Sequence, residues 1–174
     1  MLSVPRGCYP DWVEPLLNEL AATPKSVAHL VVELDDAALD AAEPGAWSPR
    51  IILAHFRDDE FLCLRAALTR MLAEDRPAMH FIEGADWEPG RNRVRDRKEW
   101  LLADFALQRQ ASLGILRMLR PEDLARTGTR DGREFTIEQL VRLWMRHDSE
   151  HLAELERLLG ESAADAKARR AHRE

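Results

Sequence analysis

The chain has 174 residues, 32% of them charged, with a formal net charge of −6. This length supports one domain with a full core, and the negative charge argues against nucleic acid as a partner. With two cysteines, no signal peptide and no apolar stretch of the roughly 20 residues that cross a bilayer, we expect a cytoplasmic protein without membrane association.

Prolines and capping residues divide the chain into four main helices, after a short one over residues 11–21. The first main helix covers residues 23–34, because a Thr-Pro pair introduces it. The second covers residues 48–72. It begins with Ser48 followed by Pro49, and a capping hydroxyl before a proline at the first helical position is typical of a helix start.

The third main helix is predicted over residues 98–119, and the fourth begins at the capping residue Thr136 and ends near Leu159, before Gly160. About 25 residues separate the second helix from the third, whereas roughly 2 to 8 join antiparallel neighbours. The fold class is therefore all-α, a four-helix bundle with one long crossover connection between helices 2 and 3, which run parallel.

Two further segments complete the prediction. Asp131-Gly132 is a tight-turn signal, so a small hairpin-like excursion is expected before the fourth helix. Residues 161–174 are charged and polar, and we predict a disordered tail there. Residues 1–160 then form the single folded domain.

Three histidines fall on inward faces of two predicted helices. His147 and His151 lie four residues apart on the apolar stripe of the fourth helix, and His55 lies one turn before Asp59 on the buried face of the second. Imidazoles at this spacing can bind one ion together. A buried imidazole without partners costs about 1–3 kcal/mol, and a shared divalent ion satisfies all three. We interpret them as metal ligands.

Spacing alone leaves open that these are core histidines held by carboxylates such as Asp59 or Glu154. The same carboxylates are candidates for orienting an imidazole or acting as a fourth ligand. The run from His147 to His151 also matches the H-x-x-E-H motif of inverted zinc peptidases, with Glu150 as general base. Few residues follow it to supply their downstream ligand, so this interpretation is disfavoured.

Polar residues interrupt the inner stripe of the third helix midway. Gln108 and Ser112 lie there, and together with Arg109 and Trp144 they are candidates for lining a substrate pocket that takes a small-molecule ligand. The alternative, that Gln108 and Ser112 bond each other and nearby carbonyls, stays open.

Taken together, the Trp-Ser-Pro start at residues 47–49, His55, residues 132–140 and the His-Asp-x-x-His run from His147 to His151 resemble the DinB superfamily of metal-binding four-helix bundles. The resemblance covers nearly the whole chain. It implies a divalent ion at the three histidines, the same long link between helices 2 and 3, and a homodimer.

Better characterised branches of this family resemble transferases and isomerases that use bacillithiol, mycothiol or glutathione. The resemblance implies Zn²⁺ or Ni²⁺ held by three neutral imidazoles, with a position left for water or a thiolate. Our first hypothesis is a metal-dependent transferase that uses a low-molecular-weight thiol. The second is a non-catalytic metal-binding or stress-response module that the ion stabilises. A metal-dependent hydrolase is a third.

Overall fold

A computed structural model describes residues 10–81 and 96–171, with side chains as far as Gly160. The elements along the chain are α1 (Val13–Val31), α2 (Asp36–Asp40), α3 (Pro49–Asp59), the π-helix η1 (Glu60–Arg65), α4 (Ala66–Ala73), α6 (Lys98–Leu116), the 3₁₀ helix η4 (Pro121–Ala125), β1 (Thr127–Arg130), β2 (Arg133–Thr136) and α7 (Ile137–Ala171). The predicted helical bundle is confirmed. None of the described helices is long and apolar enough to span a membrane.

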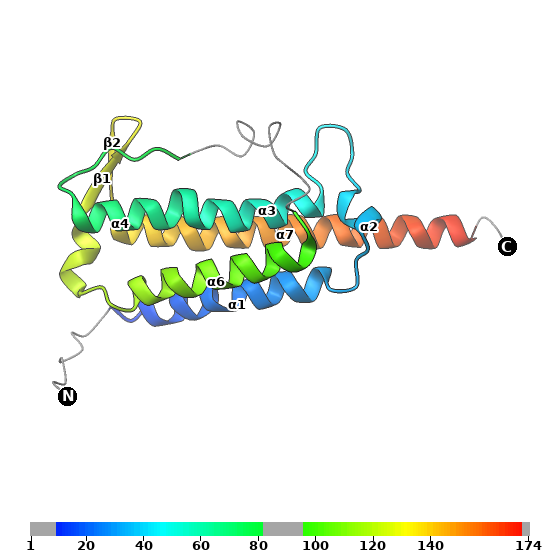
Figure 1. Cartoon of the computed structure of the whole chain (residues 1–174), viewed down its shortest axis with the longest axis horizontal. Coiled ribbons are helices and arrows are strands. Elements are labelled where there is room, and N and C mark those ends of the chain that lie inside the picture. The colour runs from blue at the N-terminus through cyan, green and yellow to red at the C-terminus, as the bar shows by residue number, and fades with distance from the viewer. Residues whose placement is uncertain (1–9, 82–95, 172–174) are drawn as a thin grey trace.

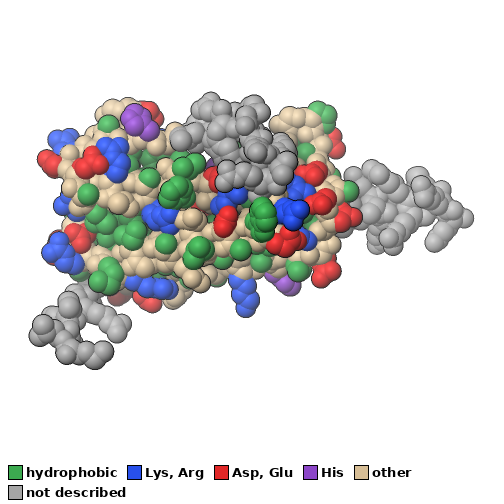
Figure 2. All heavy atoms as spheres, viewed as in Figure 1, with side chains coloured by type: hydrophobic (Ala, Val, Ile, Leu, Met, Phe, Trp, Pro, Cys, Tyr) green, Lys and Arg blue, Asp and Glu red, His purple; other side chains and the backbone are tan. Residues whose placement is uncertain are grey.

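The four long segments run up, down, down and up. Figure 1 shows α1 and α7 pointing one way, and α3–α4 and α6 pointing the other. α6 packs against both α1 and α3. Since α4 ends and α6 begins at opposite ends of the bundle, the chain between them is the predicted crossover, and this prediction is confirmed. Acidic and basic side chains are interspersed over the visible face (Figure 2).

α1 is one helix with Pro24 inside it, so the predicted division into two helices at Thr23-Pro24 is wrong. A proline cannot donate to the carbonyl four residues earlier, which here is that of Leu20. Arg109 of α6 donates to this carbonyl instead, at 2.8 Å. The helix continues through the proline because a neighbouring helix supplies the missing donor.

The predicted second helix is confirmed as α3, η1 and α4 in succession. Ser48 caps it, with its Oγ accepting from the Ile51 amide at 3.3 Å. The π-helix adds a residue to the turn, which shifts the following side chains by about 100° around the axis. Glu60, the first residue of the π-helix and four residues after the buried Phe56, is buried at 1% exposure, whereas Leu62 within the π-helix is 43% exposed.

The predicted hairpin is present as β1 and β2, antiparallel, with Thr127 opposite Thr136. Asp131 and Gly132 form its turn with φ of 52° and 75°, which is the conformation that Asp-Gly favours. Thr129 pairs with the segment after α4, accepting from the Met79 amide at 2.7 Å and donating to the Pro77 carbonyl at 2.9 Å.

Gly128 lies where this pairing brings the backbone close to other groups. A Cβ at this position would lie 3.1 Å from Met71 Cγ, 3.2 Å from the Pro77 carbonyl oxygen and 3.3 Å from Met79 Cγ. We expect Gly128→Ala to lower the free energy of unfolding by about 1 kcal/mol, measured by urea denaturation. The matched control is Gly114→Ala, because open space surrounds that helical glycine and alanine should stabilise it by about 0.5–1 kcal/mol. Equal effects of the two changes would contradict the packing at Gly128.

α7 is longer than predicted. It continues through Gly160 to Ala171, so the predicted helix end at Gly160 is wrong, and residues 161–171, predicted as a disordered tail, are helical. A glycine costs a helix only about 1 kcal/mol relative to alanine, and the alanine-rich residues that follow favour helix. Residues 172–174 of the predicted tail lie outside the described residues.

A polar layer crosses the middle of the bundle between two apolar clusters. Each of the four long helical segments contributes side chains to both clusters. With the residue of the first cluster named first, examples are Leu20 and Val27 of α1, Leu64 and Phe56 of the α3–η1–α4 segment, Leu113 and Phe105 of α6, and Trp144 and Leu155 of α7. Between the members of these pairs lie Pro24, Glu60, Arg109 and Asp148, one on each segment. The predicted histidines lie beside this layer.

Candidate metal centre

The three predicted histidines converge at one point. His55 comes from α3, and His147 and His151 from successive turns of α7. One ring nitrogen of each lies within 4.8 Å of the others, and the Nε2 atoms of His55 and His147 are 2.9 Å apart. With Zn–N bonds of about 2.0–2.1 Å, tetrahedral ligand nitrogens are roughly 3.4 Å apart. The cluster is therefore compact enough to hold one ion.

Aromatic rings enclose the cluster. Trp47, from the loop before α3, stacks on His151 with centroids 5.7 Å apart and meets the His55 ring edge-on at 4.9 Å. Phe56 meets the rings of His147 and His151 at 6.1 and 5.9 Å. These contacts restrict rotation of the three imidazoles and keep their nitrogens convergent.

The cluster is buried but reaches solvent. His55 is 7% exposed, and the side chains of His147 and His151 are 16% and 18% exposed. Burial lowers the pKa of His151, and the proximity of His147 lowers it further, against the opposing effect of Glu154. A lowered pKa favours the neutral imidazole, which is the form that binds a metal.

The two carboxylates predicted beside the histidines, Glu154 and Asp59, contact different imidazoles. Glu154 Oε2 lies 3.0 Å from Nδ1 of His151, in position to orient that ring from behind. Asp59 Oδ2 lies 3.3 Å from Nε2 of His147, the nitrogen that also faces His55. Asp59 is thus on the side where the ligand nitrogens meet, as a fourth ligand or a proton acceptor requires.

Asp148 was missed by the sequence analysis. Its Oδ1 lies 3.4 Å from Nδ1 of His147, and Arg109 donates to both its oxygens, at 2.6 and 3.1 Å. Burial raises the pKa of Asp148, but His147 and the charge of Arg109 outweigh it, so that the pKa is lowered. The available signal was its spacing: Asp148 follows the inward Trp144 by four residues.

Arg109 and Trp144 lie within the polar layer and are fully buried. Glu60 Oε2 accepts from Arg109 Nε at 3.0 Å and from Trp144 Nε1 at 2.9 Å. The remaining donors of Arg109 go to Asp148 and the Leu20 carbonyl, so the polar groups of both side chains are occupied by buried partners within the protein. Their placement argues against the substrate contact predicted for them.

Ser112 and Gln108 follow the alternative left open by the sequence. Ser112 is fully buried and donates to the Gln108 carbonyl at 3.1 Å. Arg65 donates to the same carbonyl at 3.2 Å and also hydrogen-bonds the Gln108 side chain. The hydrogen bonds from Arg65 to Gln108 link η1 to α6.

Glu150 lies away from the cluster. It is 67% exposed and faces Arg146 at 3.6 Å on the outer surface of α7. A general base must lie within hydrogen-bond reach of the reacting group. The peptidase interpretation of this motif is therefore further disfavoured.

Comparison with known proteins agrees with this fold. The sequence matches the DinB superfamily over residues 19–155. The chain belongs to the DinB superfamily. The solved structure of YfiT from Bacillus subtilis, described as a probable metal-dependent hydrolase with an unusual four-helix bundle topology, superposes with a TM-score of 0.80 at 17% identity, covering 93% of this chain and 94% of that one. No curated protein matches the chain.

The residues of this DinB-superfamily chain fit a divalent ion. One nitrogen of each of the three imidazoles lies within 4.8 Å of the others, and the Asp59 carboxylate lies 3.3 Å from Nε2 of His147. Zn²⁺ and Ni²⁺ both accept imidazole ligands.

Proposed function

We propose that this protein is a metal-dependent enzyme in which His55, His147 and His151 bind one divalent ion, Zn²⁺ or Ni²⁺. The compact three-imidazole cluster, with two Nε2 atoms 2.9 Å apart, carries this proposal. Neutral ligands leave the ion its positive charge, and a bound divalent ion lowers the pKa of a coordinated water or thiol enough to give a nucleophile near neutral pH.

The surrounding side chains have separate roles in this proposal. Asp59, beside Nε2 of His147, accepts the proton that the nucleophile releases or serves as a fourth ligand. Glu154 accepts a hydrogen bond from Nδ1–H of His151, which leaves Nε2 of that ring for the ion. Trp47 holds two of the rings in place and limits access of bulk water.

The nucleophile distinguishes two candidate reactions. We propose a low-molecular-weight thiol as the cosubstrate of a transferase. Hydrolysis, with water as the nucleophile, is the second candidate, supported by the description of YfiT as a probable metal-dependent hydrolase. The homodimer and the cytoplasmic location stay predictions.

Protein loaded with Co²⁺ separates these reactions. Titration with glutathione, bacillithiol and mycothiol should produce a near-ultraviolet thiolate-to-cobalt absorption with one of them, and the His147→Ala variant should not show it. Glu150→Gln is the matched control and should behave as the wild type, because Glu150 points to solvent. Metal-dependent hydrolysis of p-nitrophenyl esters without any thiol band would instead favour the hydrolase.

A module that the ion only stabilises behaves differently. Four tight ligands, Asp59 among them, would close the site, so that chelation lowers the melting temperature sharply while neither thiol binding nor hydrolysis occurs. That combination of results would replace the enzyme proposal.

A further inference from the structure

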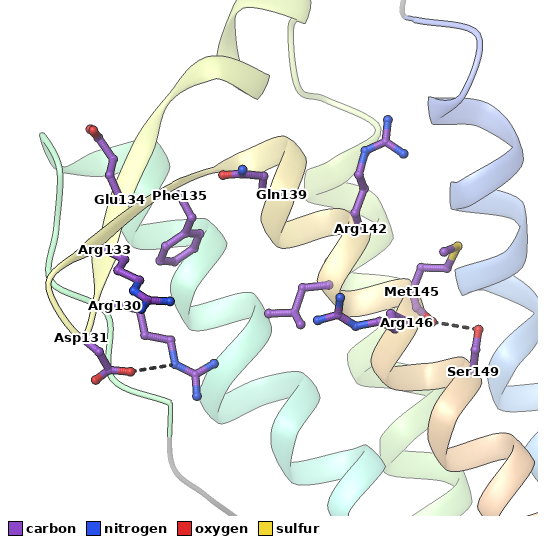
Figure 3. A pocket seen from close by; sticks show the side chains of 11 residues that line it. Arg130, Asp131, Arg133, Glu134, Phe135, Gln139, Arg142, Met145, Arg146 and Ser149 are labelled. Carbon is purple, nitrogen blue, oxygen red and sulfur yellow. Dashed lines mark hydrogen bonds and ion pairs between the residues drawn. The ribbon is translucent and has the colours of Figure 1, made fainter.

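A second candidate site lies on the outer face of α7. A groove of about 1070 Å³ separates this helix from the β1–β2 hairpin (Figure 3). Four arginines line it, two from each side: Arg130 and Arg133 from the hairpin, and Arg142 and Arg146 from α7. Phe135 and Leu143 are among its apolar residues. The volume is that of a site for a small organic molecule.

The charge of the groove is opposite to that of the chain. Four arginines face two carboxylates in its lining, whereas the whole chain carries −6. One of these carboxylates, Glu134, pairs with Arg76 outside the lining, at 3.1 Å. Among the described residues, no carboxylate pairs with Arg133. Two of the arginines have carboxylate partners of their own: Arg130 pairs with Asp131 at 3.5 Å and Arg142 with Glu138 at 2.9 Å. An anion entering the groove therefore meets chiefly the guanidinium groups of Arg133 and Arg146.

Arg146 can turn to a ligand at little cost. Its contact with Glu150 is long, at 3.6 Å, and the two side chains are 65% and 67% exposed, so the pair contributes little to stability. Figure 3 shows Arg130 and Arg146 extending from opposite sides into the space between the hairpin and α7. Arg142 is held more firmly at the rim, because its guanidinium stacks 4.1 Å above the Trp12 ring.

The groove is separate from the metal centre. Arg146 and His147 are neighbours in sequence, but their side chains leave α7 about 100° apart: that of Arg146 is 65% exposed, whereas that of His147 is 16% exposed and turns toward His55.

We propose that this groove binds a small organic anion, with its carboxylate or phosphate held by Arg133 and Arg146 and its apolar part against Phe135 and Leu143. A guanidinium offers two parallel N–H donors that match the oxygens of either anion. The apolar residues favour an anion with a hydrocarbon or aromatic portion over an inorganic ion.

Calorimetric titration of the full chain tests this site. We expect 1-naphthyl phosphate and 1-naphthoate to bind at least about tenfold more tightly than neutral 1-naphthol or inorganic phosphate. The double variant Arg133→Gln/Arg146→Gln should lose at least about tenfold in affinity for both anions. Arg117→Gln, which removes an exposed arginine of the α6 end, is the matched control and should bind as the wild type.

The His147→Ala variant distinguishes the groove from the metal centre. It should bind 1-naphthyl phosphate with unchanged affinity, and loss of binding would place the anion at the histidines and overturn the proposal. Equal affinities of the double variant and the Arg117→Gln control, or equal affinities for the naphthyl and inorganic phosphates, would also overturn it. If the double variant unfolds, two other measurements decide the same question. The single variant Arg146→Gln should bind both anions more weakly than the wild type, and the affinity of the wild type should fall with added NaCl.

Discussion

Replacing Arg109 with methionine is expected to lower the free energy of unfolding by about 3–5 kcal/mol. The change would leave Glu60 and Asp148 as buried carboxylates, at 1% and 3% exposure, without their shared cation. It would also remove the donor to the Leu20 carbonyl that Pro24 leaves free. Urea denaturation followed by circular dichroism measures the loss.

Arg146→Met is the control, because it removes the same charge from an exposed pair and should cost less than about 1 kcal/mol. Adding Glu60→Gln and Asp148→Asn to Arg109→Met should recover part of the lost stability, since the uncompensated charges are removed. A single Arg109→Met variant as stable as the control would contradict the buried network.

Asp148→Asn is expected to weaken metal binding by about 10- to 100-fold, as removal of a carboxylate behind a ligating histidine typically does. Asp148 lies beside Nδ1 of His147 and is fixed by Arg109. Its carboxylate selects the tautomer whose Nε2 is free to face His55. Competition with a chromophoric chelator measures the affinity.

The control for this variant is Glu150→Gln, which removes a neighbouring carboxylate that faces solvent. It should keep the wild-type affinity. Melting temperatures must be compared as well, because Asp148 also pairs with Arg109. If folded Asp148→Asn protein binds the ion as tightly as Glu150→Gln protein, Asp148 has no role in positioning His147.

Local signals predicted much of the fold. Ser48 accepts from the Ile51 amide as a helix cap. At the start of α7, Thr136 and Gln139 exchange side-chain to backbone hydrogen bonds at 3.2 and 2.8 Å. Such contacts join residues three apart, so the sequence displays both partners together. The inward placement of the three histidines follows from helical periodicity in the same way.

The errors arose where distant residues decide the local structure. Pro24 is typical of a helix boundary. α1 nevertheless continues beyond it, because Arg109, on another helix, donates to the Leu20 carbonyl. The π-helix over Glu60–Arg65 has no comparable sequence signal, and the buried Glu60 within it was not predicted. Arg109 was predicted to line a pocket because its two buried carboxylate partners lie on other helices, where the sequence around Arg109 does not show them.

Metal titration tests the central claim most directly. Metal-free wild-type protein should bind one equivalent of Zn²⁺ or Ni²⁺ per chain, measured by calorimetry and checked by elemental analysis. The His147→Ala variant should bind none with comparable affinity, whereas His29→Ala, which removes an exposed histidine of α1, should bind as the wild type. Wild-type protein that takes up neither ion, or equal binding by the two variants, would contradict a metal centre at His55, His147 and His151.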